Sequence, residues 1–269
     1  MMARHAFRAF AGILRREALR LLRHRSRLIS TLVRPLLWLA VFSAGFRAAL
    51  GLSITPPYAT YILYQVYIVP GLAGMMLLFH GLQSSLAMVH DRESGSMRML
   101  LASPLPRPLL LALRMAASVL SVLPLVMLFL LLARFWDVRP PLLGYLAVIP
   151  ALVLGGLALA AAGLLISAFI RQIEDFAAVM NFVIFPALFA SSALYPLWRL
   201  EEENATLAWI AWANPFTHVV ELIRFSLYLR FAPEEALTVL AVLGLSFAGA
   251  VRAYDPGRGF WGTSVAAGS

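Results

Sequence analysis

The sequence contains no cysteine and no lysine. Without cysteine there is no disulfide, no thiolate metal site and no cysteine nucleophile. Without lysine the chain cannot form the glycine-rich loop ending in Gly-Lys-Ser/Thr that holds nucleotide phosphates. Short of a rarer kind of site, any nucleoside triphosphate that serves this protein is therefore expected to be hydrolysed on a separate polypeptide.

Charge is also scarce, because charged residues make up 13% of the 269 residues and hydrophobic residues 61%. A soluble domain carries about 25% charged residues and could not hide so much apolar surface from water. Two uncharged runs, 142–170 and 176–198, are each long enough to cross about 30 Å of hydrocarbon as a helix. The composition predicts an all-α integral membrane protein.

Apolar segments and arginines together predict the topology of a single transmembrane domain, 1–269. Nine of the 22 arginines lie in the first 34 residues, which places the N-terminus in the cytoplasm. Six spans return the C-terminus to the same side, and the acid-rich stretch after the fifth span falls outside. The predicted transmembrane helices are 28–46, 61–88, 108–133, 142–170, 176–198 and 233–251.

The segment 1–27 has the pattern of an amphipathic helix lying in the membrane interface. Phe7, Leu14 and Leu21 recur at helical spacing, and arginines occupy much of the remaining surface. The alternative is an arginine-rich flank that only sets orientation. In either case anionic lipid headgroups are nearer partners than nucleic acid.

The segment 203–231 is apolar enough for a seventh span but carries His218, Glu221 and Arg224 at intervals of three. One arginine at the centre of a span alone costs about 3 kcal/mol. Asn214 followed by Pro215 is the pair expected at the start of a new helix. We therefore expect a re-entrant pair of short helices dipping into the outer leaflet.

The loop 90–107 after the second span is expected on the cytoplasmic side. Residues 93–101 can form a short helix, and the prolines at 104, 106 and 108 would end it and stiffen its link to the third span. A stiff link would transmit motion better than a flexible one. The alternative is an ordinary polar loop.

Two segments of the sequence carry short motifs. The motif residues are Arg92, Glu93, Gly95, Ser96, Leu100, Leu101, Ser103, Pro104 and Arg107 in the loop 90–107, and Asn214, Pro215, Thr217, Glu221 and Arg224 in the outer segment. In this order, the two segments resemble the membrane permeases of ABC exporters of the ABC-2 type. The loop departs from the family pattern at Ser96, where the family usually has Thr, and at Arg98, which replaces an acidic residue. The second segment resembles the family's Asn-Pro-x-Thr stretch before the last span.

The resemblance implies a half-transporter of the bacterial inner membrane, with both termini cytoplasmic. Two permease chains, a homodimer in the simplest case, would work with two cytoplasmic ATPase subunits. ATP and Mg would be held by those partners, and the loop 90–107 would dock on them as the coupling element. The permease chain itself would need no cofactor, no metal and no catalytic residue.

Polar side chains within the predicted spans are candidates for a substrate pathway. They are Tyr61, Tyr64, Gln65, His80 and Asn181. The alternative for the tyrosines is an aromatic belt at the outer membrane interface. The alternative for the amide and imidazole groups is hydrogen bonding between helices.

The sequence thus predicts an exporter permease that moves an amphipathic, lipid-linked or drug-like substrate outward. One rival is an intramembrane enzyme such as an acyltransferase, which would need clustered His, Asp or Ser residues at one interface. Another is an anchor subunit without transport activity, which would not need the loop motif.

Overall fold

The computed structural model describes residues 10–15, 19, 23, 25–46, 56–58, 62–93, 106–170 and 172–254. This part of the chain is helical and contains no strand, which confirms the predicted all-α class. Its main elements are α2 (Arg25–Phe46), α3 (Tyr64–Glu93), α5 (Arg107–Leu132), the 3-10 turn η1 (Ala133–Trp136), α6 (Gly144–Phe169), α7 (Ile173–Phe189), α8 (Leu197–Glu203), α9 (Ala205–Ala213), α10 (Pro215–Leu227) and α11 (Pro233–Ala253).

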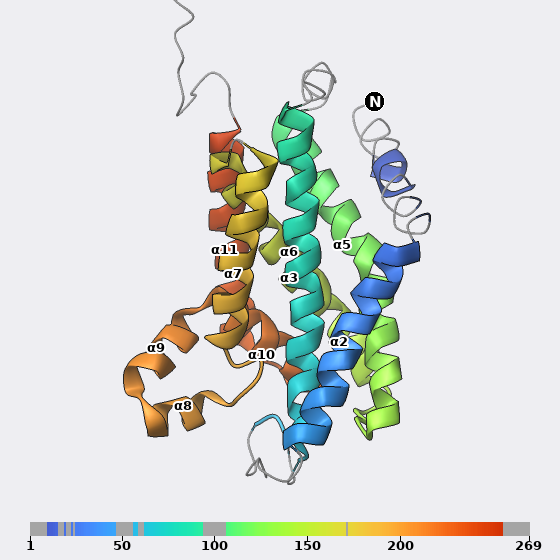
Figure 1. Cartoon of the computed structure of the whole chain (residues 1–269), viewed down its shortest axis with the longest axis vertical. Coiled ribbons are helices and arrows are strands. Elements are labelled where there is room, and N and C mark those ends of the chain that lie inside the picture. Colours follow the sequence, from blue (N-terminus) through green and yellow to red (C-terminus); the bar gives the residue numbers. More distant parts are fainter. Residues whose placement is uncertain are drawn as a thin grey trace, which may run out of the picture.

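The long helices α2, α3, α5, α6, α7 and α11 form an upright bundle, each antiparallel to the one before (Figure 1). The end of α3, the start of α5 and the end of α11 lie at the same end of the bundle as the N-terminus. The short helices α8, α9 and α10 lie at the opposite end. We call these the N-terminal end and the far end of the bundle.

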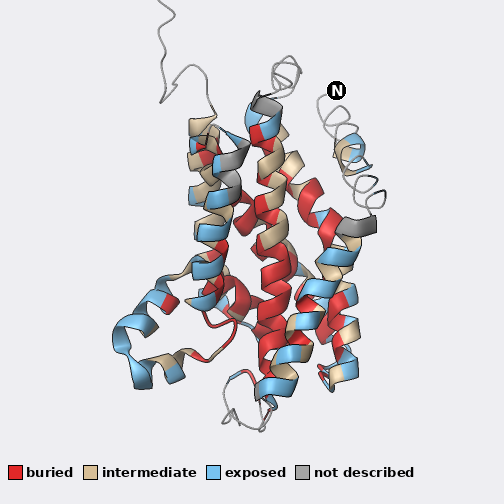
Figure 2. Ribbon diagram, viewed as in Figure 1, coloured by how far each residue is buried: buried red, intermediate tan, exposed pale blue. Residues whose placement is uncertain are grey.

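The centre of the bundle is formed by α3 and α6, which pack against each other (Figure 2). In their apolar windows 67% and 56% of residues are buried, compared with 11% in α2 and in α11. Small residues allow this packing: a Cβ on Gly163 of α6 would lie 2.8 Å from the Oγ of Ser85 on α3. The peripheral helices leave large apolar surfaces uncovered.

Five described helices are long and apolar enough to cross a membrane, one fewer than the sequence predicts. The difference is α7: the sequence predicts a span at 176–198, but the helix ends at Phe189 and its apolar part is shorter than those of the other five. Pro186 lies in the last turn of α7, and Asn214 binds the carbonyls of Ala187 and Ala190, which the helix end leaves without helical partners. Because α7 is short, the count of six spans stays a prediction.

The segment 203–231 contains two short helices, α9 and α10, that meet at Asn214, and their re-entrant placement in the outer leaflet stays a prediction. The Asn214 side chain accepts a hydrogen bond from the Phe216 amide at 3.0 Å, and Pro215 occupies the first turn of α10. The helix α8 before them was not predicted. Of the interface helix 1–27, residues 10–15 are helical and most of the rest lies outside the described residues.

Candidate functional site

The predicted coupling loop lies almost entirely outside the described residues, which stop at 93 and resume at 106. Arg92 and Glu93 belong to the last turn of α3, and Arg107 is the first residue of α5. These two helix ends lie at the N-terminal end of the bundle (Figure 1). Outside the described residues lie Gly95, Ser96, Leu100, Leu101, Ser103 and Pro104.

The second motif is brought together around Arg224, whose side chain is 1% exposed. Its Nη1 donates to the carboxylate of Glu221, one turn earlier on α10. Its Nη2 donates to the Ser192 carbonyl at 2.8 Å and to the Tyr67 carbonyl at 3.4 Å. A buried guanidinium needs such acceptors, because its desolvation is otherwise too costly. Arg224 thus joins α10 to α3 and to the segment after α7.

Asn214 and Thr217 make further bonds to the same segment. Asn214 Nδ2 donates to the Ala187 carbonyl at 2.9 Å and to the Ala190 carbonyl at 2.6 Å. Thr217 Oγ1 accepts from the Ser192 amide at 3.3 Å and donates to the Ala211 carbonyl. The Asn-Pro-x-Thr motif therefore holds the start of α10 against the end of α7.

Two of the predicted pathway residues are buried in this region. Tyr64 is 4% exposed, and its hydroxyl donates to the Leu194 carbonyl at 2.8 Å. Gln65 is 3% exposed. The hydroxyl of Tyr67, which the prediction omitted, donates a hydrogen bond to the Ser192 carbonyl at 2.9 Å. Tyr64 and Gln65 are thus part of the packed interior, and Tyr61 lies outside the described residues.

The other two pathway residues lie at cavities between the central helix α3 and the helices beside it. A groove of about 280 Å³ runs between α2, α3 and α7. We call it the α2–α3–α7 groove; it is lined by Arg34, Trp38, Met75, Phe79, Gln83, Met180, Asn181, Ile184, Phe185 and Leu188.

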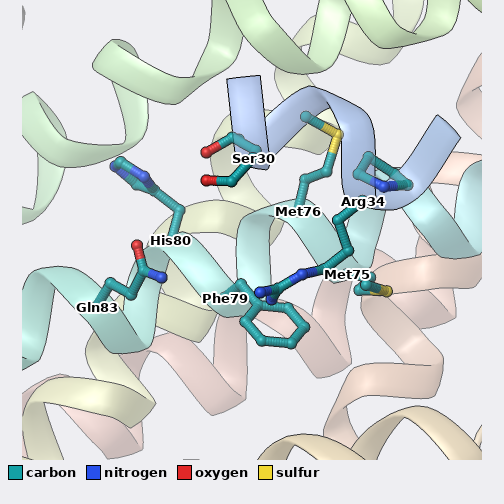
Figure 3. Close-up of a pocket in the computed structure, with 9 residues that line it drawn as sticks. Ser30, Arg34, Met75, Met76, Phe79, His80 and Gln83 are labelled. Atoms are coloured by element: carbon teal, nitrogen blue, oxygen red, sulfur yellow. The ribbon is translucent and has the colours of Figure 1, made fainter. Parts of the chain in front are cut away.

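A smaller cavity of about 40 Å³ adjoins this groove between α2 and α3 and is lined by His80 (Figure 3). The His80 Nε2 lies 3.1 Å from the Ser118 carbonyl of α5. Arg34 belongs to both cavities, and its guanidinium carbon lies 4.5 Å from the centroid of the Phe79 ring. Such a cation–π contact is attractive. The structure thus places Asn181 in a largely apolar groove with a few polar residues, and His80 in the smaller cavity next to it.

A third polar contact joins α10 to α11 at the far end. The His218 Nδ1 lies 2.5 Å from a carboxylate oxygen of Glu235. This hydrogen bond raises the pKa of His218, against the opposing effect of partial burial. The Trp212 ring lies edge-on to the His218 imidazole, with the two ring centroids 5.9 Å apart.

Sequence reasoning did not assign four of these residues to a site: Arg34, Tyr67, Ser192 and Glu235. Arg34 had a signal, because it is the one charge within the predicted span 28–46. Ser192 had none, since it contributes backbone groups. Glu235 precedes the last span, and nothing local indicates its contact with His218.

The long apolar helices of the bundle are those of a multi-pass membrane protein. The sequence profile of the family described as ABC-2 type transporter matches residues 8–228. The chain belongs to the ABC-2 type transporter family. It is also 29% identical over 219 residues to "Putative transport permease ycf38" of Cyanophora paradoxa, covering 79% of this chain and 72% of that protein.

Proposed function

We propose that the chain is the membrane permease subunit of an ATP-driven exporter in the bacterial inner membrane. Family membership and the name of the Cyanophora paradoxa relative support transport over an enzymatic role. The observation that carries the proposal is the α2–α3–α7 groove, where Arg34, Gln83 and Asn181 lie beside Trp38 and Phe185. A groove with both polar and apolar walls suits an amphipathic, lipid-linked or drug-like substrate.

The uncovered surface beside the groove supports a second permease copy as partner. Leu37 and Val41 of α2 are 58% and 66% exposed, and Phe182 and Phe185 of α7 are 79% and 49% exposed. The Trp38 ring of α2 lies 6.4 Å from the Phe189 ring of α7, so the two helices meet at one side of the bundle. A homodimer formed through α2 and α7 would enclose the groove.

Energy would come from a separate ABC ATPase, because members of this family usually work with one. The partner would bind at the N-terminal end of the bundle, where the loop 94–105 joins α3 to α5. ATP and Mg would be bound by that subunit. The isolated permease should therefore show no stoichiometric nucleotide binding in equilibrium dialysis.

Co-reconstitution tests the proposal. The permease and its cognate ABC ATPase would be placed in phosphatidylcholine vesicles with fluorescent amphiphiles of three kinds: a cationic dye, a neutral lipid and an anionic lipid. We expect ATP to drive at least one of them across the bilayer, and an ATPase variant without its catalytic glutamate to move none. Failure of the ATPase to associate, or no movement of any probe, would contradict the proposal.

A further inference from the structure

The groove is polarised along the bundle axis. Arg34 lies six residues beyond the start of the apolar window of α2, and Gln83 seven residues before the end of that of α3. At 1.5 Å per residue both lie about 10 Å from the N-terminal end. Asn181, eight residues into α7, lies at a similar depth.

The apolar part of the groove lies further from the N-terminal end. Trp38 follows Arg34 by four residues on α2, and Leu188 follows Asn181 by seven on α7, about 6 and 10 Å further along. Met75 takes the corresponding place on α3, which runs in the opposite direction. The groove therefore has a polar, cationic end and an apolar end, in the order of headgroup and acyl chain in one leaflet.

Arg34 supplies the charge at the polar end. Its side chain is exposed, and among the described residues no carboxylate forms an ion pair with it. Its described contact is with the face of the Phe79 ring, which leaves the N–H donors of the guanidinium edge able to bind an oxyanion. A charge kept at this depth without a carboxylate partner is costly, so an anionic ligand is its natural complement.

We propose that the α2–α3–α7 groove binds an amphiphile with an anionic headgroup, a phosphate or a carboxylate, taken from the N-terminal-side leaflet for transport. The headgroup lies against Arg34 with Asn181 and Gln83 beside it, and the apolar chain lies along Trp38 and Leu188. This assignment of a substrate class rests on the proposed transport function, but binding to the groove can be measured without it.

The binding experiment uses the full chain in phosphatidylcholine nanodiscs. Trp38 is retained and the other five tryptophans are changed to Phe, so that its fluorescence reports the apolar part of the groove. Phosphatidic acid and phosphatidylcholine with identical brominated chains are added at equal mole fraction. We expect phosphatidic acid to quench Trp38 more efficiently, with an apparent affinity about fivefold higher, the effect of roughly one arginine charge.

Variants separate the groove from general charge effects. Arg34→Gln should remove the preference, and Asn181→Phe should reduce it by filling the polar end while keeping the charge. Arg114→Gln, which removes an arginine from α5 outside the groove, should leave it unchanged. Melting temperatures show whether each variant is folded. If Arg34→Gln does not fold, Asn181→Phe alone tests the site. Equal quenching by the two lipids, or a preference that survives in both folded groove variants, would overturn the site.

Transport of the same ligand completes the test. In vesicles containing the permease and its ATPase, ATP should move a fluorescent phosphatidic acid across the bilayer, and Arg34→Gln should slow this movement about fivefold. If phosphatidic acid binds the groove but only a cationic or neutral probe is moved, the substrate class is wrong and the transport function stands. If no probe is moved although the lipid binds, the transport function fails and the site remains.

Discussion

Arg224 on α10 packs face-on against Tyr67 on α3, with its guanidinium carbon 3.9 Å from the ring centroid. Both residues also bind the Ser192 carbonyl, at 2.8 Å from the arginine and 2.9 Å from the tyrosine hydroxyl. A single backbone oxygen after α7 therefore holds two helices that are far apart in sequence. Gly71 of α3 makes room for this segment, because a Cβ at that position would clash with the backbone of Ala193.

Replacing Arg224 with Met should destabilise the protein strongly. The change leaves the Glu221 carboxylate without its buried arginine partner and removes one of the two donors to the Ser192 carbonyl. Breaking a buried ion pair typically costs about 3–5 kcal/mol. Thermal unfolding in detergent measures the loss. Arg230→Met, at an exposed position just after α10, should shift stability by less than about 0.5 kcal/mol. Equal effects of the two changes would contradict the role of Arg224.

Asn214→Ala should cost more stability than Asn204→Ala. Both asparagines cap a helix, a contribution of about 0.5–2 kcal/mol. Asn214 also donates to two carbonyls at the end of α7, each bond adding about 1 kcal/mol, whereas the Asn204 side chain bonds only within its own turn in the described residues. Urea or thermal unfolding of the two variants, measured side by side, shows which one loses more stability.

The contact between His218 and Glu235 should weaken at alkaline pH. The hydrogen bond from His218 to Glu235 raises the pKa of His218, so the protonated imidazole is favoured in the folded state. The stability from this contact is complete below the ordinary histidine pKa of about 6.5 and is lost as pH rises through the raised value. Hydrogen exchange at the start of α11 should therefore speed up over that range.

Two glutamate variants control this pH effect. Glu235→Gln should greatly reduce it, because the amide cannot favour the imidazolium as the carboxylate does. Glu234→Gln, at the exposed neighbouring position, should leave it intact. A pH dependence of unchanged size in Glu235→Gln would contradict the role of the His218–Glu235 contact.

Glu93→Arg should uncouple the permease from its ATPase. Glu93 ends α3 beside the loop 94–105, outside the apolar window that ends at His90, so insertion should be unaffected. We expect substrate-stimulated ATPase activity of the complex to be lost, or the ATPase to be released during purification. Glu202→Arg on α8, at the opposite end, should do neither. Normal transport by Glu93→Arg with the ATPase bound would remove Glu93 from the coupling element.

The topology is open to a direct measurement. Reporter fusions near Glu202 and at Gly262 should report opposite sides of the membrane, since α11 is the only described helix after α8 that is long and apolar enough to span. Cytoplasmic reporters should be active at Gly262, as the nine N-terminal arginines predict. Reports from one side at both positions would mean that α11 does not span.

Features that depend on nearby residues could be predicted from the sequence. The long apolar helices follow from runs of residues that each helix contains, because backbone hydrogen bonds in a helix are local. The cap at Asn214 follows for the same reason, since its partner is two residues away. The end of α7 could not be predicted, because carbonyls of Ala187 and Ala190 find their donor on Asn214, 27 and 24 residues later.

The sequence by itself determined that this protein is helical and embedded in a membrane, and it pointed to the family through two short motifs. Only the tertiary structure decided what those polar residues contact. Arg224 meets a backbone carbonyl that carries no signal in the sequence, and Arg34 gains its groove only when α2, α3 and α7 are packed together. Helix formation and membrane insertion are largely local free-energy balances, whereas a binding groove is defined by surfaces that meet only in the folded bundle.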